Sequence, residues 1–306
     1  MLRAVTPFTI ILVLGVGAWL VGRKRRSSFL YEASLILGGY FAYFGVRTIS
    51  EGSTGIALEN ARRLIELEQH LGLFIEPRIQ NLLLGSDIII SLVNWIYVWG
   101  HWPVIGGVAI WLFARRPKAY RVYRNALLIS GGIGLIFFAT FPAAPPRFTD
   151  LGLVDTVFSQ SNVAQLLQPA GFTNEYAAFP SLHFGWSLLM ATAIFRESDH
   201  THARRIAWLL PTAMLISIVA TANHFLIDAL GGGAVALTGL LIAQQIDNVN
   251  LAKRVRQVLP QARPQSSAAI ERTNSWSVSE FTVPLDIDSS LGYAITAIRT
   301  EPLRRR

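Results

Sequence analysis

The chain has 306 residues, of which 52% are hydrophobic and 15% are charged, and its mean hydropathy is +0.40. A soluble domain carries about 25% charged residues, so this composition excludes an ordinary soluble protein and indicates a membrane protein. The absence of cysteine excludes disulfides, thiolate catalysis and zinc–thiolate sites.

The apolar residues are gathered in runs of roughly 20 residues, the length that a helix needs to cross the hydrocarbon core of a bilayer. These runs are Val5–Val21, Ser28–Ile49, Asp87–Phe113, Asn125–Pro142, Phe179–Phe195, Arg205–Ala222 and Phe225–Ile246. We therefore predict an all-α, polytopic transmembrane helical bundle with a six-helix core and one additional N-terminal helix. A cleaved signal peptide is the alternative for the first run, but its basic cluster follows the run instead of preceding it.

Basic residues lie in alternate links between these runs. The links 22–27 and 114–124 hold Lys and Arg without any acid, and basic residues also flank 196–205 and follow residue 247. The intervening links 51–87 and 142–176 contain acids. Because Lys and Arg mark cytoplasmic links, we expect the N-terminus outside and the C-terminus in the cytoplasm. The net charge of +8 therefore reflects topology and not nucleic-acid binding.

This pattern divides the chain into three parts. Residues 1–27 form an N-terminal anchor with its basic link, and residues 28–247 form the membrane-embedded domain. Residues 248–306 form a polar tail that we expect to be largely disordered in the cytoplasm.

Two segments outside the apolar runs lie on the predicted outer side. The segment Ala57–Leu84 is amphipathic and predicts a helix on the membrane surface, interrupted at Glu76-Pro77. Its predicted apolar face consists of Leu64, Leu67, Leu71 and Phe74. The loop Val154–Phe172 lies near the predicted site and is a candidate lid.

Two histidines stand at the outer ends of the fifth and seventh runs, as His183 in Phe-Pro-Ser-Leu-His and His224 in Asn-His-Phe-Leu-Ile-Asp. Asp228 follows His224 by four residues, on the same helical face. Such a set suits phosphoryl transfer without a metal: one imidazole attacks phosphorus, the carboxylate orients it, and the other protonates the leaving oxygen. Structural roles for these side chains are the alternative, although ionisable groups inside a membrane are costly and usually functional.

The residues before His183 favour anion binding. Pro180 is pre-organised for the first turn of a helix, and Ser181 with the free N–H groups at that helix end predicts a phosphate pocket. Arg147 follows the fourth run and therefore lies on the same side of the membrane.

These motifs together resemble the type-2 phosphatidic acid phosphatase superfamily, and most closely its branch of inositol phosphorylceramide and sphingomyelin synthases. The resemblance covers roughly residues 40–243 and also includes Ala-Pro-Pro-Arg at Ala144–Arg147 and the three glycines Gly231–Gly233. It implies that His224 is the phosphoryl nucleophile, that Asp228 orients it and that His183 is the general acid. It also implies that Arg147 binds the phosphoryl oxygens.

The chain departs from the superfamily's phosphatases at two positions. Thr140 stands where they carry a Lys ahead of Arg147, and Ser217-Ile218 stands where they carry Ser-Arg. Fewer cations neutralise a dianionic monoester less well, so a phosphodiester substrate suits this site better.

Other polar residues have two interpretations each. Asn94, Tyr97 and His101 share one helical face and either line the cavity or form a polar packing seam. His200 and His202 resemble a fragment of a metal site, but they fall in a cytoplasmic link, which favours a solvated loop. We find no carboxylate cluster on the outer face and expect neither a metal nor another cofactor.

The sequence thus predicts a multi-pass enzyme of the cell membrane that acts on a lipid phosphate ester at the extracytoplasmic face, through a phosphohistidine. The acceptor is water in a lipid phosphatase and a hydroxyl group in a phosphotransferase, and the sequence does not choose between them. A catalytically inactive transporter or scaffold with the same fold is the alternative function.

Overall fold

The computed structural model describes residues 31–32, 34–35, 38–39, 54–157 and 176–258. The first N-terminal apolar run, all but six residues of the second run, most of the candidate lid and residues 259–306 of the predicted tail fall outside these residues. The chain divides into two compact units, Met1–Lys253 and Arg254–Arg306. The division into 1–27, 28–247 and 248–306 stays a prediction.

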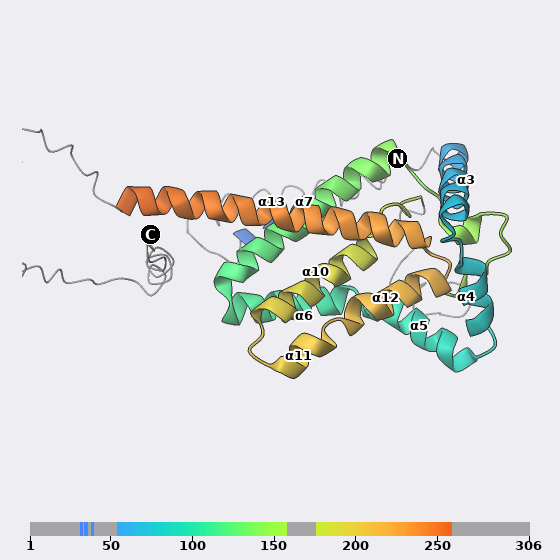
Figure 1. The fold of residues 1–306 in the computed structure, drawn as a ribbon, viewed down its shortest axis with the longest axis horizontal. Coiled ribbons are helices and arrows are strands. Elements are labelled where there is room, and N and C mark those ends of the chain that lie inside the picture. The colour runs from blue at the N-terminus through green and yellow to red at the C-terminus, as the bar shows by residue number, and fades with distance from the viewer. Residues whose placement is uncertain (1–30, 33, 36–37, 40–53, 158–175, 259–306) are drawn as a thin grey trace, which may run out of the picture. The chain divides into compact units, whose positions relative to one another are not determined.

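The described chain is helical (Figure 1). Its elements are α3 (Thr54–Leu71), α4 (Glu76–Leu83), α5 (Asp87–Trp99), α6 (Trp102–Arg115), α7 (Pro117–Thr140), η1 (Pro146–Phe148), α10 (Leu182–Glu197), α11 (Thr201–Ile206), α12 (Leu209–Ala220) and α13 (Leu226–Val258). No strand occurs among the described residues, where the backbones of Ala143 and Ala177 form an isolated bridge. The predicted all-α membrane bundle is confirmed.

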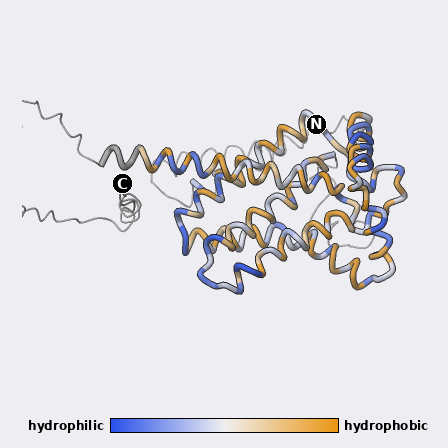
Figure 2. The backbone as a smooth tube through the Cα atoms, viewed as in Figure 1, coloured by the Kyte–Doolittle hydropathy of each residue, from blue (hydrophilic) through white to orange (hydrophobic). Residues whose placement is uncertain are grey.

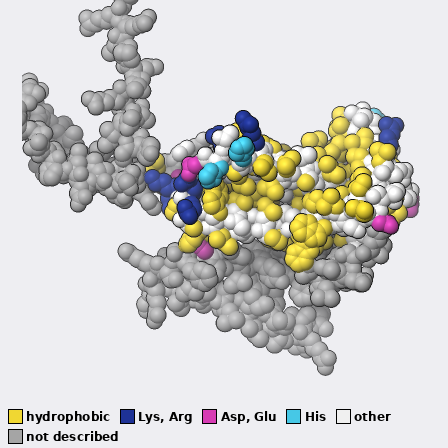
Figure 3. Space-filling view, turned by 90° about the horizontal axis from the view of Figure 1, so that it is seen from below, with side chains coloured by type: hydrophobic (Ala, Val, Ile, Leu, Met, Phe, Trp, Pro, Cys, Tyr) yellow, Lys and Arg dark blue, Asp and Glu magenta, His cyan; other side chains and the backbone are white. Residues whose placement is uncertain are grey.

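Among the described residues, three stretches are long and apolar enough to cross a membrane: Pro117–Thr140, Thr201–Ala220 and Leu226–Ala252. The pair α5 and α6 makes a fourth candidate, bent by 46° at its break. Hydrophobic residues run along the length of these helices, whereas hydrophilic residues gather on α3, on α11 and at the turn between α6 and α7 (Figure 2). In Figure 3, hydrophobic side chains cover the middle of the face seen.

The helix predicted at Phe179–Phe195 begins and ends later in the chain than expected, at Leu182 and Glu197. Helix α10 has 16 residues and begins at Leu182, because the Ser181 side chain accepts the Phe184 N–H as its N-cap. Pro180 therefore precedes the cap and does not occupy the first turn, which corrects the sequence-based expectation. Helix α10 lies centrally and packs against α6, α7 and α12.

Glycines allow α10 and α13 to approach each other closely. A Cβ atom on Gly232 would overlap the backbone carbonyl of Ser181, and one on Gly185 would overlap the carbonyl of Gly232. A Cβ atom on Gly231 would lie 2.7 Å from the Phe179 ring. Backbone contact at this point sets the distance between the first turns of the two helices.

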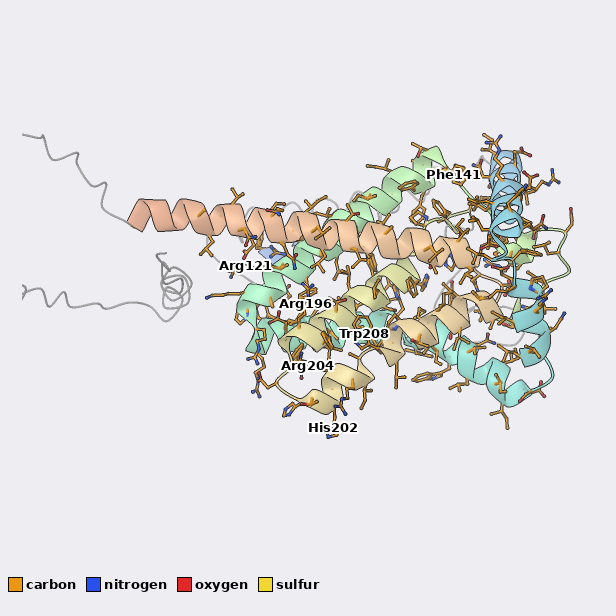
Figure 4. The ribbon with its side chains drawn as sticks, viewed as in Figure 1. Arg121, Phe141, Arg196, His202, Arg204 and Trp208 are labelled. Carbon is orange, nitrogen blue, oxygen red and sulfur yellow. The ribbon has the colours of Figure 1, made fainter. Side chains whose placement is uncertain are left out.

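Basic side chains gather toward one end of the bundle, and the C-terminal end of the apolar helix α7 lies toward the other end. Figure 4 labels Arg121, Arg196 and Arg204 toward one end of the helices and Phe141, at the end of α7, toward the other. At the basic end, Arg116 pairs with Asp199 and donates from Nε to the carbonyl of Glu197 at 3.1 Å.

The surface helix differs from its predicted form. The buried face of α3 carries Ala57, Asn60, Ala61, Leu64 and Glu68. Leu67 and Leu71, which were predicted on the apolar face, are 44% and 58% exposed. The predicted break comes earlier, at residues 72–75, and Pro77 lies in the first turn of α4 instead of ending a helix. Pro fits there because its missing N–H is not needed.

Candidate active site

His224 lies in the short turn that joins α12 to α13. Its Nδ1 atom is 2.8 Å from the carbonyl oxygen of Ala178 and 3.3 Å from Oδ2 of Asp228. Because a carbonyl oxygen only accepts hydrogen bonds, Nδ1 must carry the proton. The lone pair of the neutral ring is then on Nε2, which is the nitrogen available for attack on phosphorus.

Asp228 holds the same turn from inside α13. Its side chain is fully buried, and Oδ2 accepts the N–H of Phe225 at 2.8 Å. The preceding end of the turn is fixed by α12, where the carbonyl of Ile218 accepts the N–H groups of Asn223 and His224 at 3.1 Å each. The turn is therefore held by hydrogen bonds on both sides of the histidine.

His183 lies in the first turn of α10, beside His224. The centroids of the two imidazole rings are 5.7 Å apart, with an angle of 56° between their planes. The N–H of Ser181 donates to the carbonyl of Asp228 at 2.9 Å and so joins the start of α10 to α13. Ser181, predicted to bind phosphate, is fully buried and uses its Oγ to cap α10.

His101 and Tyr97 also pack against His183. The ring of Tyr97 stacks on the His183 ring, with 4.7 Å between the ring centroids. The centroid of the His101 ring lies 4.4 Å from that of the His183 ring. His101 occupies the break between α5 and α6 and stacks on Trp186 at 5.7 Å. Its Nδ1 atom is buried and has no hydrogen-bond partner among the described residues.

Asn94 lies on α5, as Tyr97 does, but its side chain contacts Thr156 and not His183. Its Nδ2 donates to the carbonyl of Thr156 at 2.8 Å, and its Oδ1 accepts from the Thr156 hydroxyl at 2.9 Å. Both ends of the amide thus hold the loop after η1, and this arrangement favours the packing interpretation for Asn94.

Arg147 reaches the His224 turn from η1. Its backbone N–H donates to the carbonyl of Ala222 at 3.1 Å, and its guanidinium donates to Oδ1 of Asn223. Its Nε lies 3.1 Å from Oδ2 of Asp155. The structure therefore brings Arg147, His183, His224 and Asp228 to one site from three separate segments: η1, the start of α10 and the turn into α13.

His200 and His202 lie apart from this site. Both are exposed at the start of α11, and Figure 4 labels His202 next to Arg204 near the basic end. Within the described ranges, no group of three or more His, Cys, Asp or Glu residues is arranged to hold a metal ion.

Sequence reasoning missed two glutamates at the site. Glu68 of α3 and Glu76 of α4 are fully buried and accept backbone N–H groups at the start of α13. With Asp228 they bring three carboxyl groups together, which corrects the expectation that no such cluster exists on this side. The available signal was a glutamate four residues after Leu64, on the face of α3 that carries Ala57 and Ala61.

The chain belongs to the PAP2 superfamily, whose family model matches residues 62–242 and so includes every candidate site residue named above. This family is the one that the motifs resemble. The match explains why the two histidine motifs and Ala144–Arg147 occur together in one chain.

Two curated relatives come from the branch that the motifs resemble. The chain is 24% identical over 201 residues to the inositol phosphorylceramide synthase catalytic subunit aur1 of Schizosaccharomyces pombe, covering 56% of this chain and 46% of the relative. It is 24% identical over 193 residues to the inositol phosphorylceramide synthase of Candida albicans, covering 53% and 40%. The chain thus spans less than half the length of either relative.

A solved structure gives a weaker likeness. The crystal structure of Aquifex aeolicus LpxE aligns with a TM-score of 0.43 and 16% sequence identity, over 56% of this chain and 93% of that chain.

Proposed function

We propose that this protein is a membrane enzyme that cleaves or transfers the phosphoryl group, or phospho-headgroup, of a lipid phosphate ester through a phosphohistidine on His224. The observation that carries the proposal is the Nδ1 bond of His224 to the Ala178 carbonyl. This bond leaves Nε2 of His224 as the nucleophile, and the imidazole of His183 lies next to it.

In the first step, Nε2 of His224 attacks phosphorus and forms the N–P bond while the bond from phosphorus to the leaving oxygen breaks. His183 donates a proton to that oxygen, so the first product leaves as an alcohol. The phosphorylated ring bears a positive charge, and Asp228, 3.3 Å from Nδ1, stabilises it.

In the second step, His183 removes a proton from the acceptor, whose oxygen attacks phosphorus and releases His224. If the acceptor is water, the enzyme is a lipid phosphatase; if it is a hydroxyl group of a second substrate, the enzyme is a phosphotransferase. Arg147 supplies positive charge for the phosphoryl oxygens. Because Arg147 also contacts Asp155 and Asn223, a singly charged phosphodiester is the donor class that this site suits best.

We further propose that the site faces the extracytoplasmic side. The basic links at the start of α7 and around α11 lie away from the end of the bundle where α7 and α12 end and α13 begins. Because basic links mark the cytoplasmic side, this separation supports the proposal. The reaction would then use lipids of the outer leaflet of the cell membrane.

Purified protein incubated with a panel of labelled lipid phosphate esters tests this function. Release of phosphate from a monoester, or of a phosphorylated headgroup from a diester, identifies a hydrolase, and a new phospholipid, formed only when a hydroxyl acceptor is added, identifies a transferase. Turnover of no lipid in the panel, together with specific lipid binding, would instead support an inactive transporter or scaffold.

A further inference from the structure

The first turn of α13, directly after His224, is held by carboxyl groups from three helices. Three consecutive backbone N–H groups, those of Phe225, Leu226 and Ile227, donate to Asp228 Oδ2 at 2.8 Å, Glu76 Oε1 at 2.8 Å and Glu68 Oε1 at 2.7 Å. The next N–H, that of Asp228, donates to the Phe225 carbonyl at 3.1 Å. The first N–H groups of a helix have no partner within the helix, and here those of Leu226 and Ile227 donate to carboxyl groups of two other helices.

Helix α4 contacts both sides of the catalytic turn. Glu76 holds Leu226 after the turn, and Gln80, one helical turn later on α4, donates to the carbonyl of Ala220 before it, at 3.0 Å. Helix α3 is fixed as well, because Asn60 donates to the Pro142 carbonyl at 2.9 Å. The two glutamates therefore project from well-anchored helices.

Glu68 and Glu76 are both fully buried, and the Oε2 atom of each has no hydrogen-bond partner among the described residues. An ionised carboxylate can only accept hydrogen bonds, and a second carboxylate offers it no donor. Two buried adjacent charges would also be costly. One shared proton removes both problems, because it allows one carboxyl group to donate a hydrogen bond to the other.

The electrostatics of the site agree with this arrangement. Burial, together with the charge and hydrogen bonding of Glu76 and the charge of Asp228, raises the pKa of Glu68 from 4.5 to about 8, against the lowering effect of the Ile227 N–H.

We propose that Glu68 and Glu76 share one proton and act as a positioning pair, which fixes the first turn of α13 and thereby the His224 ring for phosphoryl transfer. Neither glutamate touches the reacting atoms. The proposal rests on the proposed function for its catalytic consequence, but the shared proton itself is independent of that function.

Amide substitutions test the shared proton. In Glu68→Gln or Glu76→Gln, the amide oxygen still accepts the backbone N–H and the NH₂ group replaces the shared hydrogen. Each single variant should keep kcat within about threefold of the wild type. The double variant places two NH₂ groups against each other, and its kcat should fall on the order of 10–100-fold, as for other lost supporting contacts. KM should change far less than kcat.

Thermal unfolding in detergent provides a second readout that does not need activity. A raised pKa stabilises the folded state fully below about pH 4.5, and this contribution is lost as the pH rises to about 8. The Tm of Glu68→Gln relative to the wild type should therefore increase with pH across this interval. Glu66→Gln, on the exposed face of the same helix, is the matched control and should show no such trend.

Two results would overturn the proposal. One is a single Gln variant as impaired in kcat as the double variant. The other is a Tm difference between Glu68→Gln and the wild type that does not change with pH. If the wild-type protein turned over no lipid phosphate ester, the proposed function would fail, and the unfolding measurements would still decide whether the proton is shared.

Discussion

His224 donates its Nδ1–H to the main-chain carbonyl of Ala178 over 2.8 Å, so the backbone fixes the tautomer of the proposed nucleophile. Asp228 lies slightly farther from the same nitrogen, at 3.3 Å, and is bonded to the Phe225 N–H. In the proposed mechanism the carboxylate stabilises the charge that develops on the ring, while in the structure it holds the turn and the carbonyl sets the direction of the ring.

The proposed roles predict different losses of activity for substitutions of Asp228 and His183, the two side chains beside His224. Asp228→Asn leaves the Ala178 bond in place and should retain measurable activity. His183→Gln removes the general acid and should lower kcat about 10²–10⁴-fold, the usual contribution of such catalysis. Steady-state kinetics with the same lipid measure both variants. His202→Ala, an exposed histidine outside the site, is the control and should behave as the wild type; equal losses in all three variants would contradict the assignment.

A substitution of His101 tests whether the side chains that pack on His183 contribute to catalysis or only to packing. Its buried Nδ1 lacks a partner among the described residues and its ring contacts that of His183, so we expect a substrate group or water to complete it. His101→Phe keeps the stacking on Trp186 and should lower kcat/KM about tenfold, as expected for one lost hydrogen bond in a buried site. A changed Tm with unchanged kcat/KM would instead assign His101 to the packing seam.

Much of the site is predictable from sequence because its residues are ionisable groups at the ends of apolar runs. His183, His224, Asp228 and Arg147 were found in this way, and the structure places them together. The Ala178 carbonyl could not be found, because any residue type supplies a carbonyl.

The glutamate pair was missed for a different reason. In a membrane protein, apolar side chains face lipid as well as the core, so hydrophobic periodicity does not separate the buried face of a helix from the exposed one. On α3 the buried residues are mostly small or polar and include a single leucine, Leu64, whereas Leu67 and Leu71 are exposed.

Chelation tests the predicted chemistry. One oxygen of each carboxylate at the site accepts a backbone N–H, and the proposed mechanism assigns the roles of nucleophile and acid to the two imidazoles. We therefore expect activity to survive EDTA and to be inhibited by vanadate, which mimics five-coordinate phosphorus. Loss of activity on chelation, with recovery on adding one divalent ion, would show that the mechanism is misassigned.

The orientation of the site is testable because the chain contains no cysteine. Single cysteines at Asp150, beside η1, and at Thr201, at the start of α11, occupy exposed positions in the two opposite kinds of link. In intact cells, an impermeant maleimide should label the first, and the second should be labelled only after lysis. The reverse pattern would place the site in the cytoplasm and remove outer-leaflet lipids as substrates.

Trapping the intermediate tests the central claim most directly. A lipid ester labelled at phosphorus, mixed with the enzyme and quenched rapidly in alkali, should leave label on the protein as phosphohistidine, and peptide mapping should locate it at His224. His224→Ala should carry no label and have no activity while remaining folded in the membrane. Turnover by His224→Ala, or label on any other residue in the wild type, would contradict the account.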